Sequence, residues 1–320
     1  MPNYSGVWDL RQQGVAKEGG IWQLSPETGG RGVFAGGNYT NRIEYINISV
    51  TSNASDFGDL TENKHGAAGC GSNTRGLVCG NDTGSDTSDT VEYITIATLG
   101  NGLDFGNLTV TRKLTSAHSS QTRAVVGGGN NQSSGAVDTI DYHAIDTLGN
   151  FSDFGNLTST SQTLTSCSSP TIGLFAGGSN VSGTNINIIC KVTIASANNA
   201  TDFGDLSSVR RDLASCSSNT RGVFAGGSDN QFVNIIEYVT IASDSNTTDF
   251  GDLLATISKL SGTSNSTRGV FAGGTLGTGY DSNVIQYITI ASTANSIDFG
   301  DIADDRPYMA AISDSHGGLS

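Results

Sequence analysis

The chain has 320 residues, of which 14% are charged, and its 16 basic and 30 acidic residues give a formal net charge of −14 at pH 7. This balance argues against nucleic-acid binding, because neutralising phosphates requires clustered Lys and Arg, and it disfavours an anionic membrane surface. No apolar run approaches the roughly 18 residues of a transmembrane helix. Residues 1–5 lack the basic segment and apolar core of a signal peptide. Five cysteines without paired spacing give no disulfide framework, so we expect synthesis in a reducing cytosol.

Residues 1–26 differ from the rest of the chain and contain both tryptophans, Trp8 and Trp22. The segment has the composition for one or two helical turns. One interpretation is a leader that packs on the side of the following domain. The other is a docking peptide in which Trp8 and Trp22 anchor the chain in another subunit, because large aromatic side chains dominate interface energetics.

Residues 27–320 contain six repeats, each with three sequence markers in the same order. The triplet Asp-Phe-Gly ends each repeat and recurs every 47 to 49 residues, beginning at Asp56, Asp104, Asp153, Asp202, Asp249 and Asp298. A segment close to Arg-Gly-Val-Phe-Ala-Gly-Gly begins at Arg31, Arg75, Arg123, Ile172, Arg221 and Arg268. Between them lies Ile-Glu-Tyr or a close variant, which the fourth repeat replaces with Ile189-Cys190-Lys191. A regular period near 49 residues predicts stacked units of one supersecondary structure.

Each repeat predicts four short strands. In the fifth repeat we expect them at 213–218, 222–225, 235–242 and around 249–250, with alternating apolar positions in the third. Gly226 and Gly227 end the second strand, where the missing Cβ permits positive φ. The Asp-Phe-Gly triplet is interpreted as an aromatic plug followed by a glycine turn that Asp caps.

The two ends of the repeat region complement each other. The first repeat begins at its second strand, whereas residues 306–312 match a first strand and follow the last Asp-Phe-Gly. The sequence therefore predicts an all-β, six-bladed β-propeller of four-stranded blades over residues 27–320, closed by the C-terminal strand joining the N-terminal blade. Closure removes exposed sheet edges.

The loops between the second and third strands (2–3 loops) vary most among the repeats and carry the candidate binding residues. Those candidates are Tyr39, Asn41, Asn130, Asn230, Phe232 and Tyr280. We expect Tyr39, Phe232 and Tyr280 to be exposed. Their setting among Asn and Ser suits contacts with carbohydrate or protein, and equally suits loops that only face solvent.

Cys70, His118, Cys167 and Cys216 occupy one equivalent position of four consecutive first strands. Such ligands invite a zinc interpretation, but small side chains there also suit packing between blades, which we favour. The Asp residues after Asp-Phe-Gly are better explained by turn capping than by Ca²⁺ binding. We therefore expect no metal and no cofactor.

No set of catalytic residues emerges from the sequence. The Asp-Phe-Gly triplet is also a kinase motif, but it recurs without a phosphate-binding glycine loop. His65, His143 and His316 are expected to be isolated. The prediction is a non-enzymatic protein.

The repeats resemble the kelch family, through Arg211, the pair Gly226-Gly227, Tyr238 and Phe250 in that order, although Phe replaces the usual Trp.

The leader and the segments Tyr-Ile-Thr-Ile-Ala and Asp-Phe-Gly-Asp-Leu also resemble structural proteins of tailed bacteriophages. This resemblance implies a virion component, as a decoration or tail-fibre protein made in the host cytoplasm. Its partners would be other virion subunits, bound through residues 1–26, and a host-surface glycan or protein. The alternative is a free, extracellular bacterial glycan-binding module or adhesin.

Overall fold

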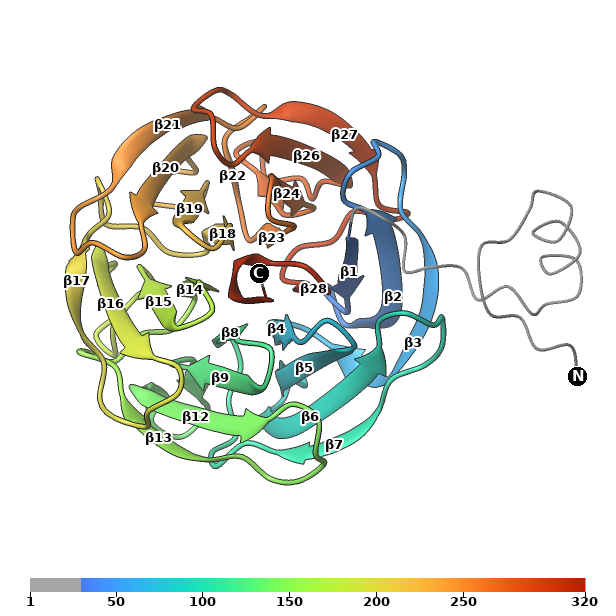
Figure 1. Ribbon diagram of the computed structural model, residues 1–320, viewed down its shortest axis with the longest axis vertical. Helices are drawn as coiled ribbons and strands as arrows, with labels where there is room; N and C mark the ends of the chain where they lie inside the picture. The colour runs from blue at the N-terminus through green and yellow to red at the C-terminus, as the bar shows by residue number, and fades with distance from the viewer. Residues whose placement is uncertain (1–29, 320) are drawn as a thin grey trace, which may run out of the picture.

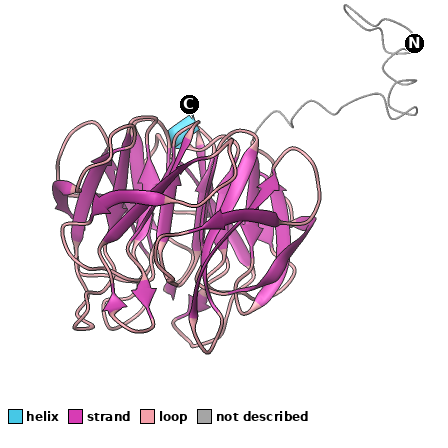
Figure 2. Ribbon diagram, turned by 90° about the horizontal axis from the view of Figure 1, so that it is seen from below, coloured by secondary structure: helices cyan, strands magenta, loops and turns pink. Residues whose placement is uncertain are grey.

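The structure is a computed structural model that describes residues 30–319. Six four-stranded antiparallel sheets stand as blades around a central axis (Figure 1), which confirms the predicted six-bladed β-propeller. Seen from the side, the blades form a thick disc with loops on its two faces (Figure 2). No helix in the described residues is long and apolar enough to cross a membrane.

Each blade contributes one strand to each of four concentric positions. The inner strands are β28 (Ala310–Ser313), β4 (Ala68–Gly71), β8 (Ser116–Ser119), β14 (Thr165–Ser168), β18 (Ala214–Ser217) and β23 (Ser261–Ser264). The second strands are β1 (Arg31–Ala35), β5 (Arg75–Asp82), β9 (Arg123–Gly127), β15 (Ile172–Ala176), β19 (Arg221–Ala225) and β24 (Arg268–Ala272). The third strands are β2 (Thr40–Asn47), β6 (Thr87–Thr95), β12 (Thr139–Ala144), β16 (Ile188–Thr193), β20 (Ile235–Thr240) and β26 (Val284–Thr289). The outer strands are β3 (Ser55–Lys64), β7 (Leu103–Asn107), β13 (Ser152–Asn156), β17 (Thr201–Asp205), β21 (Thr248–Asp252) and β27 (Ile297–Asp301).

Five short elements lie outside the blades. The pair β10 (Asn130–Asn131) and β11 (Gly135–Ala136) closes one 2–3 loop, and β22 (Ile257–Ser258) pairs with β25 (Thr275–Leu276). The 3₁₀ helix η1 (Gly317–Leu319) follows the last strand.

The C-terminal strand closes the ring as predicted. β28 pairs antiparallel with β1, with Val33 opposite Ile312 and Ala35 opposite Ala310. The sheet order β28-β1-β2-β3 therefore joins the two ends of the repeat region in one blade.

The Arg of the second strand links neighbouring blades. The guanidinium of Arg31 lies 4.6 Å from the ring centroid of Tyr45 on the third strand, and it donates at 2.7 Å to the carbonyl of Ile96 in the next blade. Five blades repeat this arrangement. The exception is the fourth repeat, where Ile172 and Lys191 stand in place of the Arg and the Tyr. Both members of the stacked pair are therefore replaced together.

The Asp-Phe-Gly triplet lies in the outer strand, which confirms the strand and the buried aromatic residue predicted there, whereas the glycine turn predicted after them is wrong. In the first blade Gly58 pairs with Ile43 and Asp56 pairs with Glu44, which leaves Phe57 as the extra residue of a β-bulge. The bulge turns the Phe57 ring edge-on to Tyr45 in the core. A Cβ on Gly58 would lie 2.5 Å from the carbonyl oxygen of Gly100 in the next blade. Glycine is required there because two blades approach backbone to backbone.

The same contact recurs in every blade through an Asn side chain of the neighbouring blade, which accepts a hydrogen bond from the N–H that follows the bulge glycine. The acceptors, with N···O distances of 3.0–3.1 Å, are Asn101, Asn150, Asn199, Asn246, Asn295 and Asn53. Because the bond recurs at all six junctions, including the one that closes the ring, it fixes each blade on its neighbour.

Four blades bury an ion pair between a basic residue, located four positions before the inner strand, and an acidic residue of the third strand. The pairs are Arg306–Glu44, Lys64–Glu92, Arg112–Asp141 and Arg210–Glu237. The other two blades have neutral residues at both positions, Ser161 with Cys190 and Ile257 with Gln286. A buried charge without its partner is costly, which accounts for the joint replacement.

Candidate functional site

A closed ring of backbone hydrogen bonds surrounds one end of the central channel. Its six members lie two residues before each inner strand, and each N–H donates to the carbonyl of the member before it at 2.7–3.2 Å. We call this set the mouth ring: Gly66, Leu114, Thr163, Asp212, Lys259 and Tyr308. All six have left-handed φ values, between 54° and 64°. The six members of the mouth ring therefore share their φ range and their backbone hydrogen bonds, but they differ in their side chains.

Five of the six members are not glycine, which makes the mouth ring strained. A non-glycine residue in this region costs about 1–3 kcal/mol and persists only where the surroundings over-determine it. Here the ring of hydrogen bonds and the adjoining blades do so. Backbone strain of this kind concentrates at functional sites. The side chains of the mouth ring are therefore candidates for a binding site.

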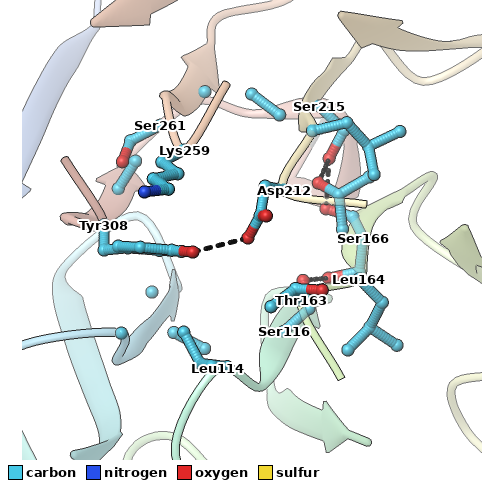
Figure 3. A pocket seen from close by; sticks show the side chains of 18 of the residues that line it. Leu114, Ser116, Thr163, Leu164, Ser166, Asp212, Ser215, Lys259, Ser261 and Tyr308 are labelled. Atoms are coloured by element: carbon cyan, nitrogen blue, oxygen red, sulfur yellow. Dashed lines mark hydrogen bonds between the residues drawn. The ribbon is translucent and has the colours of Figure 1, made fainter. Parts of the chain in front are cut away.

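Inside the mouth ring lies a pocket of about 110 Å³ (Figure 3). The hydroxyl of Tyr308 reaches across it and donates to Asp212 Oδ1 at 2.7 Å, while Arg211 Nε lies 3.5 Å from Oδ2. Burial raises the pKa of Asp212, opposed by the Tyr308 hydrogen bond. Burial, with the Asp212 charge, raises the pKa of Tyr308 as well. The phenol therefore stays protonated and acts as the donor.

Lys259 supplies the pocket's cation. Its ammonium lies 5.4 Å from the centroid of the Tyr308 ring. Among the residues that the structure describes, no carboxylate lies within 4.0 Å of it and its side chain makes no hydrogen bond. The nearby carboxylates already have partners: Asp212 has those described above, and Asp82 has Lys113 at 2.9 Å.

An aromatic row leads from the pocket to the rim of the same face. His65 lies edge-on to Tyr308, with ring centroids 4.9 Å apart, and Tyr39 stacks on His65 at 4.4 Å with an interplanar angle of 8°. The Tyr39 hydroxyl donates to Asp82 at 3.2 Å. Burial lowers the pKa of His65, so it is neutral at pH 7. The expectation that His65 is isolated is therefore wrong.

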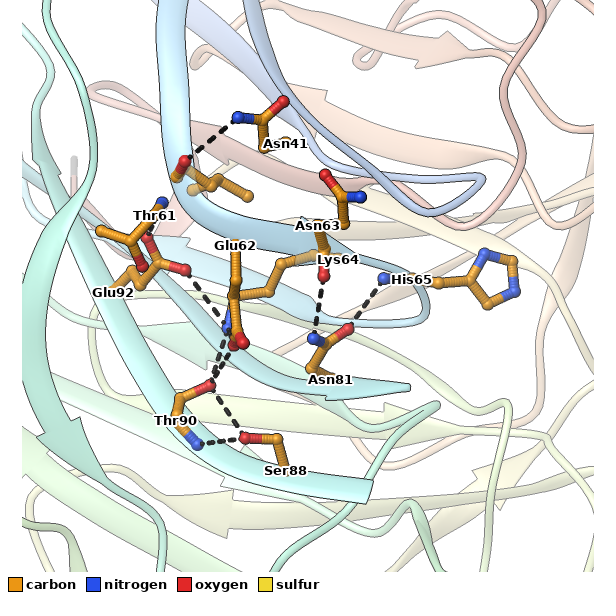
Figure 4. A network of polar contacts seen from close by, with 11 residues as sticks. Asn41, Thr61, Glu62, Asn63, Lys64, His65, Asn81, Ser88, Thr90 and Glu92 are labelled. Carbon is orange, nitrogen blue, oxygen red and sulfur yellow. Dashed lines mark hydrogen bonds and ion pairs between the residues drawn. The ribbon is translucent and has the colours of Figure 1, made fainter. Parts of the chain in front are cut away.

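The position of His65 depends on a polar network beneath it (Figure 4). The side chain of Asn81 accepts from the His65 N–H at 2.9 Å and donates to the Asn63 carbonyl at 3.0 Å. The buried ammonium of Lys64 contacts Glu62 at 2.8 Å and Glu92 at 3.3 Å. This network ties the segment before β4 to the second blade, which places the His65 ring between the two tyrosines.

Tyr39 itself sits in strained backbone at the tip of a tight turn. Asn38 and Tyr39 have φ values of 46° and 57°, and the Thr40 N–H donates to the Gly37 carbonyl at 3.1 Å. Consecutive left-handed residues are usually Asn or Gly. One face of the ring covers His65, and the side chain remains 44% exposed.

The other predicted binding residues do not join this row. Tyr280 is 76% exposed at a loop tip, and Asn230 is also exposed. Phe232, expected to be exposed, is half-buried, and its backbone pairs with Ser228. Asn41 and Asn130 hold their loops, donating to the Leu60 carbonyl and to the Gln162 side chain. Trp8 and Trp22 lie outside the described residues.

The opposite end of the channel is covered by the C-terminal residues, as Figure 2 shows for η1. Gly318 lies so close to the inner strands that a Cβ there would sit 1.9 Å from the Ser119 carbonyl oxygen. His316 Nε2 lies 3.2 Å from Ser119 Oγ and 3.1 Å from the Gly71 carbonyl, and burial lowers its pKa to about 4. Any ligand that enters the channel therefore meets the mouth ring first.

The Cys and His side chains of the inner strands point between blades. A Cβ on Gly222 would lie 2.9 Å from Cys167 Sγ, and one on Gly269 would lie 2.3 Å from Cys216 Sγ. His118 packs at 4.7 Å against Phe175, and burial lowers its pKa to about 3. These contacts fit the packing interpretation, and the residues that the structure describes include no cluster placed to hold a metal ion.

Sequence reasoning missed Asp212, Lys259 and Tyr308. The repeat offered one signal, because these residues share a position two before each inner strand and differ strongly in chemistry. Matching this chain to known protein families found no family model that fits it, and no curated protein matched either.

Proposed function

We propose that this chain is a non-enzymatic binding propeller that attaches to a surface through the face carrying the mouth ring and the 2–3 loops. The observation that carries the proposal is the row of Tyr39, His65 and Tyr308 beside the pocket. Aromatic rings held at the rim of a polar pocket are typical of recognition sites. Tyr39 and Tyr308 both have positive φ values, so the fold sustains backbone strain at both rings, which supports the proposal.

As its setting we propose a bacteriophage virion, in which the chain is a decoration or tail-fibre protein. The support is the resemblance of its kelch-like repeats and leader to such proteins. Residues 1–26, with Trp8 and Trp22, would bind other virion subunits, and the mouth face would meet the host surface. The first described residues support this division: Gly30 lies beside Ser315, at the end of the disc opposite the mouth ring. Electron microscopy of the assembly should place residues 1–26 in a neighbouring subunit, and a leader folded on its own propeller would contradict this.

The second candidate is a free bacterial glycan-binding module or adhesin. The same aromatic row favours this candidate, because sugar rings can stack on aromatic side chains. Its function does not require assembly into a virion. The two candidates share the binding face and differ only in what the leader does.

The binding face is tested by a glycan array carrying bacterial surface polysaccharides, probed with the full chain. Tyr39→Ala should abolish binding, because it removes the exposed ring of the row. Leu103→Ala is the matched control, since Leu103 is 54% exposed on an outer strand. Equal loss in both variants, or binding unaffected by Tyr39→Ala, would contradict the proposed face.

A further inference from the structure

We infer that the mouth pocket binds a sugar residue carrying a carboxylate, as in a glycan that contains uronic or sialic acid. The inference rests on the proposed binding face and names the ligand class that this face recognises. It starts from Lys259, whose ammonium forms no ion pair within 4.0 Å among the described residues and acts on Asp212 only from a greater distance, where its charge lowers the pKa of that carboxyl group.

The charges around Lys259 leave it available to an anion. Asp82 is held by Lys113 at 2.9 Å, and Asp212 is held by Tyr308 at 2.7 Å and Arg211 at 3.5 Å. Asp281, farther out on a 2–3 loop, accepts from Thr275 at 2.8 Å. Each carboxylate thus has a donor of its own. An ammonium binds a carboxylate through a charge-assisted hydrogen bond, which is about twice as strong as a neutral one.

The surroundings of Lys259 fit a sugar better than a small inorganic anion. The row of Tyr308, His65 and Tyr39 begins beside the ammonium and ends at the exposed face of Tyr39. The apolar face of a pyranose ring packs on such an aromatic face. Hydroxyl groups of Thr163 and Ser116 line the pocket wall, where Thr163 donates to the Gln162 carbonyl at 2.6 Å and Ser116 pairs with Ser166 at 2.8 Å. Their oxygens retain lone pairs that can accept hydrogen bonds from sugar hydroxyls.

The geometry of the site is fixed before a ligand arrives. The mouth ring sets the backbone of Lys259 and Tyr308, and the hydrogen bond to Asp212 holds the Tyr308 ring across the pocket. Binding therefore costs little ordering of the protein. Only the Lys259 side chain has to adjust to reach the carboxylate.

The test compares oligogalacturonate with the same oligomer after its carboxyl groups are reduced to alcohols, by calorimetric titration of the full chain. A second pair of probes is sialyllactose and lactose. The wild-type chain should bind at least one acidic probe about tenfold or more tightly than its neutral counterpart, the effect of one charged hydrogen bond. Lys259→Gln should remove this preference and Lys259→Arg should keep it.

Lys191→Gln is the control, because it removes the same charge from a surface pair with Asp244 that lies outside the pocket. Its preference for the acidic probe should equal that of the wild type. Equal binding of acidic and neutral probes, a preference that survives Lys259→Gln, or no binding of either acidic probe would overturn the inference. Binding of neutral glycans at least as tight as binding of the acidic probes, and abolished by Tyr39→Ala, would overturn it while leaving the proposed function intact.

Discussion

The buried pair of Arg210 and Glu237 can be exchanged for the neutral pair that the sixth repeat uses. Glu237 Oε2 accepts from the Ser207 N–H at 3.0 Å and from Thr247 Oγ1 at 2.6 Å. At the equivalent place Gln286 Oε1 accepts from the Leu254 N–H at 2.9 Å and from Ser296 Oγ at 2.7 Å. A glutamine at 237 can therefore keep both bonds.

Arg210→Ile alone should lower the free energy of unfolding by about 3–5 kcal/mol, because it leaves the Glu237 charge buried without its partner. At roughly 2 °C per kcal/mol for a chain of this size, the thermal midpoint should fall by about 6–10 °C. Adding Glu237→Gln reproduces the pair Ile257 and Gln286 and should recover most of the loss. The coupling between the two sites should then be about 3 kcal/mol.

The assay is thermal unfolding of the wild type, both single variants and the double variant, followed by far-ultraviolet circular dichroism. The four midpoints form a double-mutant cycle. Additive effects, with the double variant less stable than Arg210→Ile, would refute the reasoning that the sixth repeat is a neutral replacement of a charged pair.

Three further predictions concern the blade junctions and the channel. Gly155→Ala should destabilise the propeller by at least about 2 kcal/mol in chemical denaturation, since its Cβ would lie 2.7 Å from the Asn198 carbonyl group and φ is 142°; an effect below 0.5 kcal/mol would contradict the close approach. Thr163→Gly should raise the free energy of unfolding by about 1 kcal/mol in the same denaturation assay, because it relieves a left-handed β-branched residue, and a loss of stability would show that the side chain outweighs the strain. For His118, the folded pKa of about 3 lies below the unfolded value of about 6.5, so its contribution to stability is complete above pH 6.5 and is lost as pH falls toward 3. His118→Cys, which copies Cys167, should therefore lose less stability than the wild type between pH 6.5 and 4, and equal acid sensitivity of the two proteins would contradict this.

The fold could be read from the sequence because each marker of the repeat performs one recurring structural task. The Arg and the Tyr stack within a blade, and the glycine of Asp-Phe-Gly lets the next blade approach. The bulge in the outer strand could not be predicted, because a glycine after an aromatic residue is equally typical of a turn. Strand pairing decides between them, and pairing depends on the whole sheet.

The candidate site was harder to predict for a related reason. Tyr39, His65 and Tyr308 are far apart in the chain, and ring closure brings the last of them to the first two. Their side-chain directions depend on left-handed backbone at Tyr39 and Tyr308, which the residue types do not suggest. The equivalence of the mouth-ring positions was visible in the repeats, but their common backbone was not.

Closure by the C-terminal strand also has a consequence during synthesis. β1 leaves the ribosome more than 270 residues before its inner partner β28 (Ala310–Ser313). Until then β1 presents an unpaired edge, which invites pairing with other chains. At translation rates of about 5–20 residues per second, that exposure lasts on the order of tens of seconds. Chaperone binding to nascent chains should thus concentrate on the first blade.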